Sequence, residues 1–186
     1  LTWSRRNELG DGAYEEGTRG GLTRFGVDVV REMDRLGMVV DVSHLSEATF
    51  WHAVEVSTKP LIASHSNARA LCGHSRNLSD EQAKAVADRG GVIGVTFVGP
   101  FLGDGRQSVQ GVVDHIDHFA GVIGTDHIAI GSDFDGVPDS SLPEGLPDVS
   151  RMPALIDELA RRGYSDAAVR GIMGENLLRT VEGVIG

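Results

Sequence analysis

Three apolar segments of the sequence end in side chains that commonly bind metal ions. VVDVSH ends at His44, PLIASH ends at His65, and in IAIGSDFDGV an apolar run leads directly to Asp133. Neutral imidazole and carboxylate are both zinc ligands, and catalytic zinc sites leave one coordination position open for water or substrate. The three residues together predict a metal centre. The alternative is a pair of histidines that are simply hydrogen-bonded in a polar cleft.

The segments that carry these residues have the pattern of buried parallel strands. Short, continuous apolar runs bounded by glycine or polar turns are typical of such strands. Helical patterns separate them, and this alternation indicates parallel βαβ units, whose C-terminal strand ends carry the chemistry. His44 and His65 are one unit apart, so we expect them at neighbouring strand ends. The expected strands are 38–42, 61–64, 92–98 and 127–131, and the expected helices are 23–36, 47–56, 80–88, 109–123, 152–162, 166–173 and 175–184.

Four βα units make up about half of an eight-stranded barrel, which usually has roughly 250 residues or more. The predicted fold class is therefore α/β, of the (β/α)8 TIM-barrel type, with only the C-terminal half present. We expect residues 1–186 to form a single partial domain and the chain to begin inside a larger fold, because Leu1 to Trp3 resembles the end of a strand. Residues 4–21 and 99–105, which are rich in glycine and polar residues, are expected to be loops.

Composition excludes several classes of partner. The chain has 17 Lys and Arg against 27 Asp and Glu, a net charge of -10, which argues against binding to nucleic acid phosphates. Its apolar runs are far shorter than the roughly 20 residues of a membrane-spanning helix, so we expect no membrane association. The single cysteine, Cys72, excludes an internal disulfide and indicates a reducing compartment. We expect a bacterial, cytoplasmic protein in which Cys72 is a small buried hydrophobic residue.

Several motifs occur in an order that resembles one enzyme family. VDVSH, IASHSNARALCGHSRNLSD, GVIGV, IGSDFDGV, EGLPDVSRMPALIDEL and GENLLRTVEGV together resemble the membrane dipeptidase (renal dipeptidase) family of zinc peptidases. The resemblance implies a barrel of the metal-dependent hydrolase type with a two-zinc site. It also implies hydrolysis of dipeptides, often with a D-residue at the C-terminal position.

The resemblance assigns a role to each candidate residue. His44 and His65 become ligands of one zinc ion, and Asp133 becomes the catalytic carboxylate that handles the proton of the attacking water. Arg76, in the HSRN turn, would bind the substrate's terminal carboxylate. Trp3 stands where the mammalian enzymes carry a histidine thought to assist the transition state. An indole cannot donate that proton, so Trp3 is expected to line the substrate pocket.

Other metal ligands of the family have no counterpart in this sequence. The first-strand His-x-Asp pair and the bridging glutamate should lie upstream of Leu1. We therefore expect the complete site to hold two zinc ions, and this chain alone to hold at most one and to be inactive. The remaining half of the site is expected from a homodimer partner or from a missing N-terminal half. Either would also cover the open edges of the sheet.

Two other functions remain open at this stage. The same zinc site and Arg76 would serve an amidohydrolase-type deacylase of N-acyl amino acids. The chain could equally be a catalytically inactive half-barrel module that needs a partner. His115 and His118, three positions apart on one expected helix, are placed on the outer surface of the barrel without a metal role.

Overall fold

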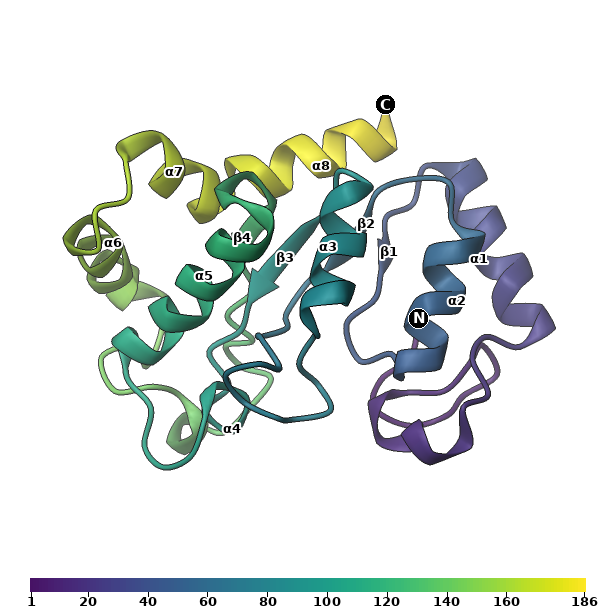
Figure 1. Cartoon of the computed structure of the whole chain (residues 1–186), viewed down its shortest axis with the longest axis horizontal. Helices are drawn as coiled ribbons and strands as arrows, with labels where there is room; N and C mark the ends of the chain where they lie inside the picture. The colour runs from purple at the N-terminus through teal and green to yellow at the C-terminus, as the bar shows by residue number, and fades with distance from the viewer.

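The protein is an α/β structure built on one parallel sheet. The computed structural model describes residues 1–186, apart from the side chain of Glu16. The sheet has four strands in the order β1-β2-β3-β4, which is also their order along the chain (Figure 1). Consecutive strands pair in parallel because a helix-containing connection returns the chain to the same end each time. The strands are β1 (Val40–Asp41), β2 (Leu61–Ala63), β3 (Val92–Val95) and β4 (Ile128–Ile130).

The main helices begin at the positions that the sequence predicts. Thr23, Ser46 and Ser79 each cap a helix, because their side-chain oxygens accept hydrogen bonds from free backbone N–H groups of the first turn. The helices are α1 (Arg24–Leu36), α2 (Glu47–Val56), α3 (Asp80–Asp88), α4 (Gly99–Leu102), α5 (Val109–Ile123), α6 (Met152–Arg161), α7 (Asp166–Arg170) and α8 (Asn176–Ile185).

The helices form a row against the sheet. In Figure 1 the row runs from α1 through α2, α3 and α5 to α6, and α8 lies across one end of the strands. Each helix packs on the next, and α3 and α5 also contact β3. One hydrophobic core joins the helices and the sheet. Its buried side chains come from positions between Leu22 and Ile172 of the sequence. None of the described helices is both long and apolar enough to cross a membrane.

Several predicted element boundaries are wrong. The strands are shorter than expected. For example, β3 ends at Val95, and the next N–H, that of Thr96, donates to the side chain of Asn67 and not to a neighbouring strand. The predicted loop 99–105 contains α4, since Pro100 fits a first helical turn, where its missing N–H costs nothing. The predicted loop 4–21 contains a 3-10 helix, Ala13–Thr18. The expected helix 166–173 ends at Arg170, and a π-helical segment, Gly171–Glu175, leads into α8.

Two side chains lie in environments other than those predicted. His115 is not on the outer surface: it is 1% exposed, and its ring joins the N–H of Ala68 to the carbonyl of Leu102 at 3.0 Å each. The polar ring can be buried because it satisfies two backbone groups, one in the connection between β2 and α3 and one at the end of α4. Cys72 is half-buried, with its thiol 3.5 Å from the carbonyl of Pro100, so it is not a core residue.

Candidate metal centre and substrate pocket

The two predicted metal-binding histidines meet at the C-terminal ends of neighbouring strands. His44 follows β1 and His65 follows β2, and their Nε2 atoms lie 2.7 Å apart. The Nδ1 atom of each ring is 3.0 Å or less from a serine hydroxyl, Ser4 for His44 and Ser64 for His65. Both Nε2 atoms are therefore directed to one point, while the Nδ1 atoms are engaged on the protein side.

The N-terminal segment fixes the backbone at His44. The carbonyl of His44 accepts hydrogen bonds from the N–H of Ala13 at 2.7 Å and from the hydroxyl of Thr2 at 3.2 Å. His44 has φ 68°, in the left-handed region that non-glycine residues seldom adopt. Such strained backbone persists where surrounding contacts impose it and is often found at functional sites. The first residues of the chain thus orient the His44 ring.

Strand pairing fixes His65, and here the structure adds a residue that the sequence did not reveal. Asp41, at the end of β1, accepts hydrogen bonds from the backbone N–H of Ser43 at 2.9 Å and of Ser64 at 3.0 Å. Its second carboxylate oxygen accepts from the Ser64 hydroxyl at 2.5 Å. Burial alone would raise the pKa of Asp41, but these hydrogen bonds lower it below its ordinary value.

Both imidazoles are neutral at physiological pH. Burial, with the nearby positive charge of Arg76, lowers the pKa of His44 to about 3. The same two causes lower the pKa of His65. A histidine must be deprotonated to bind a metal ion, so the pocket already holds both rings in the form that a ligand requires.

Arg76 is a buried cation with unused hydrogen-bonding capacity. Its side chain is 3% exposed, one terminal nitrogen donates to the carbonyl of His65 at 3.3 Å, and its guanidinium carbon lies 5.6 Å from the ring centre of Phe101. Among the described residues its Nε has no hydrogen-bond partner. Burial lowers the pKa of Arg76 to about 10, so it stays charged at neutral pH. A buried charge without a carboxylate beside it is costly unless a ligand supplies one.

A pocket of about 260 Å³ connects the predicted site residues. Trp3 forms an exposed part of its wall: its side chain is 73% exposed, and its ring stacks on His44 with centroids 6.1 Å apart. Asp133 has φ 60°, a second strained position at the site. The structure thus brings all five predicted residues to one place, together with two that sequence reasoning missed, Tyr14 and Phe101. The lining includes Trp3, Tyr14, His44, Arg76, Phe101 and Asp133.

The arrangement fits part of a metal centre. Two neutral imidazoles with converging Nε2 atoms and a carboxylate on the same wall are the donor types that zinc prefers. Within the described part of the chain, no group of three or more His, Cys, Asp or Glu side chains is close enough to enclose an ion. His44 and His65 would bind the metal, and further ligands would have to come from elsewhere.

Almost the whole chain matches one known protein family. The model of the family described as membrane dipeptidase (Peptidase family M19) matches residues 1–185. The chain belongs to this family.

Family relatives are similar along almost the whole chain. Dipeptidase verJ of Clonostachys rogersoniana is 40% identical over 99% of the chain, which covers 47% of that protein. A metallopeptidase of Rhodobacter sphaeroides, solved with a phosphinate mimic of L-Ala-D-Ala, is 34% identical with a TM-score of 0.91. The alignment covers 98% of this chain and 54% of that one. An amidohydrolase of Pseudomonas aeruginosa is 33% identical with a TM-score of 0.92, and the alignment covers 100% and 64%.

The chain therefore spans about half to two thirds of the length of these relatives. The parallel α/β architecture matches that of membrane dipeptidase family metallopeptidases over about half of their chains, as a partial barrel should. The predicted fold class and the predicted family are confirmed.

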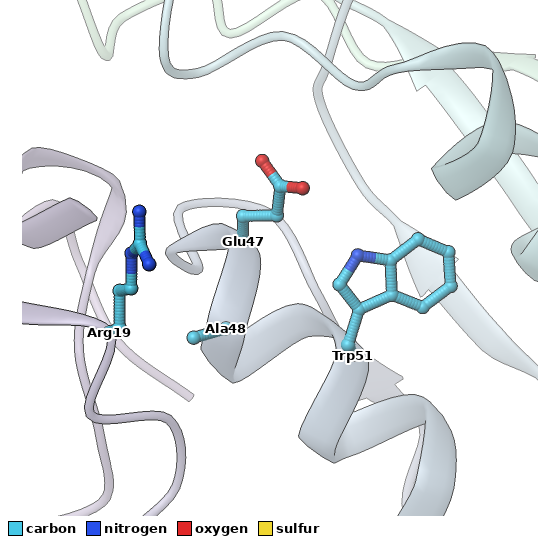
Figure 2. A pocket seen from close by; sticks show the side chains of 4 residues that line it. All are labelled: Arg19, Glu47, Ala48 and Trp51. Atoms are coloured by element: carbon cyan, nitrogen blue, oxygen red, sulfur yellow. The ribbon is translucent and has the colours of Figure 1, made fainter.

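A second hollow, of about 460 Å³, lies away from the two histidines. Figure 2 shows Glu47, Ala48 and Trp51 on α2 and Arg19 on the facing loop. Glu47 already pairs with Arg69 at 3.2 Å, and its side chain is largely exposed to solvent. We assign the chemistry to the pocket at the strand ends. Its wall includes the buried cation Arg76 and His44, whose imidazole meets that of His65.

Proposed function

We propose that this chain carries one side of the active site of a zinc-dependent dipeptidase. The observation that carries the proposal is the convergence of the His44 and His65 Nε2 atoms, 2.7 Å apart. They meet at a pocket that is lined by His44, Arg76 and Asp133. Family membership supports it. The rest of the site would come from the other half of a (β/α)8 barrel, in the same polypeptide or as a partner.

Each residue has a defined part in the proposed reaction. His44 and His65 bind the ion; zinc, when bound, supplies Lewis acidity and an activated water at neutral pH. Asp133 accepts the proton of the attacking water and returns it to the leaving amine, as a general base and then a general acid. Arg76 binds the C-terminal carboxylate of the dipeptide with two parallel hydrogen bonds, which places the scissile bond over His44 and His65.

This side of the pocket has room for the end of a short peptide. A volume of about 260 Å³ accommodates a short peptide end, and Trp3 and Tyr14 form its apolar rim. The Rhodobacter relative was solved with a mimic of a dipeptide whose second residue has D configuration. We therefore propose dipeptides, including those with a C-terminal D-residue, as the substrate class.

A second candidate reaction is the deacylation of N-acyl amino acids, which present the same carboxylate and a similar amide bond. One of the relatives is an amidohydrolase from Pseudomonas aeruginosa, and this similarity supports deacylation as the second candidate. Steady-state rates on L,L-dipeptides, L,D-dipeptides and N-acyl amino acids separate the two reactions. Dipeptide hydrolysis should dominate, and faster turnover of N-acyl amino acids would replace the proposed reaction with the second one.

The half-site proposal has its own test. The chain with added zinc should hydrolyse no dipeptide, and activity should appear on mixing it with a separately expressed N-terminal half of the barrel. Robust hydrolysis by the chain alone, abolished by His65→Ala, would contradict the need for a second half. A mixture that binds zinc but hydrolyses nothing would instead support an inactive module.

A further inference from the structure

A chain of hydrogen bonds links Asp41 to His65 through a hydroxyl group. The Asp41 carboxylate accepts from the Ser64 hydroxyl at 2.5 Å, and the Ser64 oxygen lies 2.7 Å from Nδ1 of His65. Asp41 ends β1 and Ser64 directly follows β2. The two strands pair with Asp41 opposite Ile62, so the sheet itself sets this geometry. The three groups form a continuous path that ends at a proposed metal ligand.

The direction of each hydrogen bond follows from the chemistry of the groups. An ionised carboxylate only accepts, so the single hydroxyl proton of Ser64 must point to Asp41. The lone pairs of the Ser64 oxygen are then left to accept, and the His65 ring must supply the proton from Nδ1. A neutral imidazole with its proton on Nδ1 has a free lone pair on Nε2, which is the form that binds a metal ion.

We propose that Asp41 is a positioning residue: through Ser64 it holds His65 in the tautomer that leaves Nε2 free for the metal. The inference rests on the proposed metal site. Hydrogen-bonded groups behind a metal ligand fix its tautomer and orientation and raise its basicity. Asp41 also accepts hydrogen bonds from the backbone N–H groups of Ser43 and Ser64, so a test of its positioning role must keep these two bonds.

No such pair of a carboxylate and a hydroxyl group fixes the tautomer of His44. The Nδ1 of His44 lies 3.0 Å from Ser4, and among the described contacts no carboxylate stands behind that hydroxyl. Ser4 can donate or accept by rotation. With the lone pair of His65 Nε2 fixed, the 2.7 Å contact between the Nε2 atoms requires His44 to donate its Nε2 proton. His65 is thus prepared for the metal, whereas His44 must change tautomer when the metal binds.

Asp41→Asn tests this directly, because it keeps the shape of the side chain and reverses one hydrogen bond. Oδ1 of Asp41 accepts two backbone N–H groups, so an asparagine would place its oxygen there and its NH2 toward Ser64. That NH2 donates to the Ser64 oxygen, and the hydroxyl then donates to His65 Nδ1. The ring is driven to the tautomer that carries its proton on Nε2, with the fold preserved.

The experiment is ¹⁵N NMR of the metal-free, histidine-labelled protein, followed by titration with Zn²⁺. Wild-type His65 should show a protonated Nδ1, Asp41→Asn should show a protonated Nε2, and Zn²⁺ affinity should fall by about 10- to 100-fold. The matched control is Ser4→Ala, which removes the hydroxyl at His44 and should leave the His65 tautomer unchanged. An unchanged His65 tautomer in Asp41→Asn would overturn the proposal.

Ser64→Ala by itself gives a measurement that holds even if Asp41→Asn does not fold. It removes the hydroxyl that accepts from Nδ1 of His65, so ¹⁵N NMR should show the ring no longer fixed in the Nδ1-protonated tautomer, and an unchanged tautomer would overturn the proposal. Ser64→Ala should also weaken Zn²⁺ binding, and adding Asp41→Asn should cause no further loss of affinity. Asparagine keeps the backbone hydrogen bonds that Asp41 accepts from Ser43 and Ser64, and in the proposal Asp41 affects the His65 ring only through the Ser64 hydroxyl. Additive losses in the double variant would contradict the proposed path. The tautomer measurement needs no activity, so it is independent of the proposed function. If the tautomer shift is seen but no dipeptide is hydrolysed even after the N-terminal half of the barrel is supplied, the proposed function is refuted and this inference stands.

Discussion

Gly131 lies directly against the carbonyl oxygen of Ser64, the residue that precedes His65. A β-carbon at Gly131 would stand 1.9 Å from that oxygen and 3.1 Å from the α-carbon of His65. Gly94 on β3 makes a similar approach, with its β-carbon position 2.1 Å from the same oxygen. Both contacts are with backbone, which cannot rotate away. The absence of side chains at these two positions thus lets the strand ends carry His65 to the site.

Gly131→Ala should therefore damage both the fold and the metal site. Overpacking of this kind costs about 1–3 kcal/mol of unfolding free energy, and the shift it imposes on His65 should weaken Zn²⁺ binding. Chemical denaturation and zinc titration measure the two effects. Gly121→Ala on α5 is the matched control, because nothing lies within 4 Å of its β-carbon position and alanine favours the helix. Equal stability of both variants would refute the close approach.

The zinc stoichiometry of the isolated chain provides a second prediction. In the proposed site His44 and His65 would supply two ligands of the usual four, so the chain should bind at most one Zn²⁺ ion, weakly. His44→Ala and His65→Ala should each abolish this binding, while His52→Ala on α2 should preserve it. Atomic absorption after dialysis gives the count. Tight binding of two ions per chain would mean that other ligands lie within these residues.

Arg76 allows a test by substrate design in the complete enzyme. Arg76→Lys keeps a positive charge but loses the two-pronged geometry for a carboxylate. A lost charged hydrogen bond is worth about 1.5–3 kcal/mol, or roughly a 10- to 100-fold drop in kcat/KM for a free dipeptide. The corresponding dipeptide amide has no carboxylate and should lose much less. Similar losses on both substrates would remove Arg76 from this role.

Arg69→Lys serves as the control for that substitution. Arg69 belongs to the same connection between β2 and α3, but it pairs with Glu47 and is not among the residues that line the pocket. The Arg69→Lys substitution should therefore leave the ratio of dipeptide to dipeptide-amide turnover at the wild-type value.

The sequence was sufficient to predict the elements and the meeting of the main site residues. Capping serines and apolar periodicity are local signals, so α2 and α3 could be located closely. His44, His65 and Asp133 could be grouped because parallel strands place their C-terminal ends at one edge. Asp41 could not be recognised, since its role depends on which residue of β2 lies opposite β1, and strand register is not written in either strand alone.

Long-range contacts explain the remaining errors. His115 was placed on the outside because its partners, Ala68 and Leu102, are distant in sequence. Tyr14 and Phe101 were missed because the segments that carry them were predicted to be plain loops, whereas each contains a short helix that faces the pocket. In these cases the deciding contact lies between segments that only the folded chain brings together.

The buried ring of His115 leads to a prediction about acid sensitivity. Nδ1 accepts from the N–H of Ala68 and Nε2 donates to the carbonyl of Leu102, so the ring is neutral in the folded state. Burial lowers its pKa; His118 adds to the decrease, while the Leu102 hydrogen bond and Asp114 oppose it. The unfolded chain has the ordinary histidine pKa of about 6.5 and therefore binds an extra proton below that pH. The stability that His115 contributes is complete above pH 6.5 and is lost as the pH falls below it.

His115→Gln should accordingly flatten the dependence of unfolding free energy on pH. One proton corresponds to a slope of at most about 1.4 kcal/mol per pH unit, and the slope between pH 6.5 and 5 should fall by up to that amount. Urea denaturation at a series of pH values gives the slope. Val112→Ala, at a buried position on the same helix, should lower stability equally at every pH. If His115→Gln lowers the unfolding free energy but leaves its pH dependence unchanged, then uptake of a proton by His115 on unfolding is not the cause of the acid sensitivity.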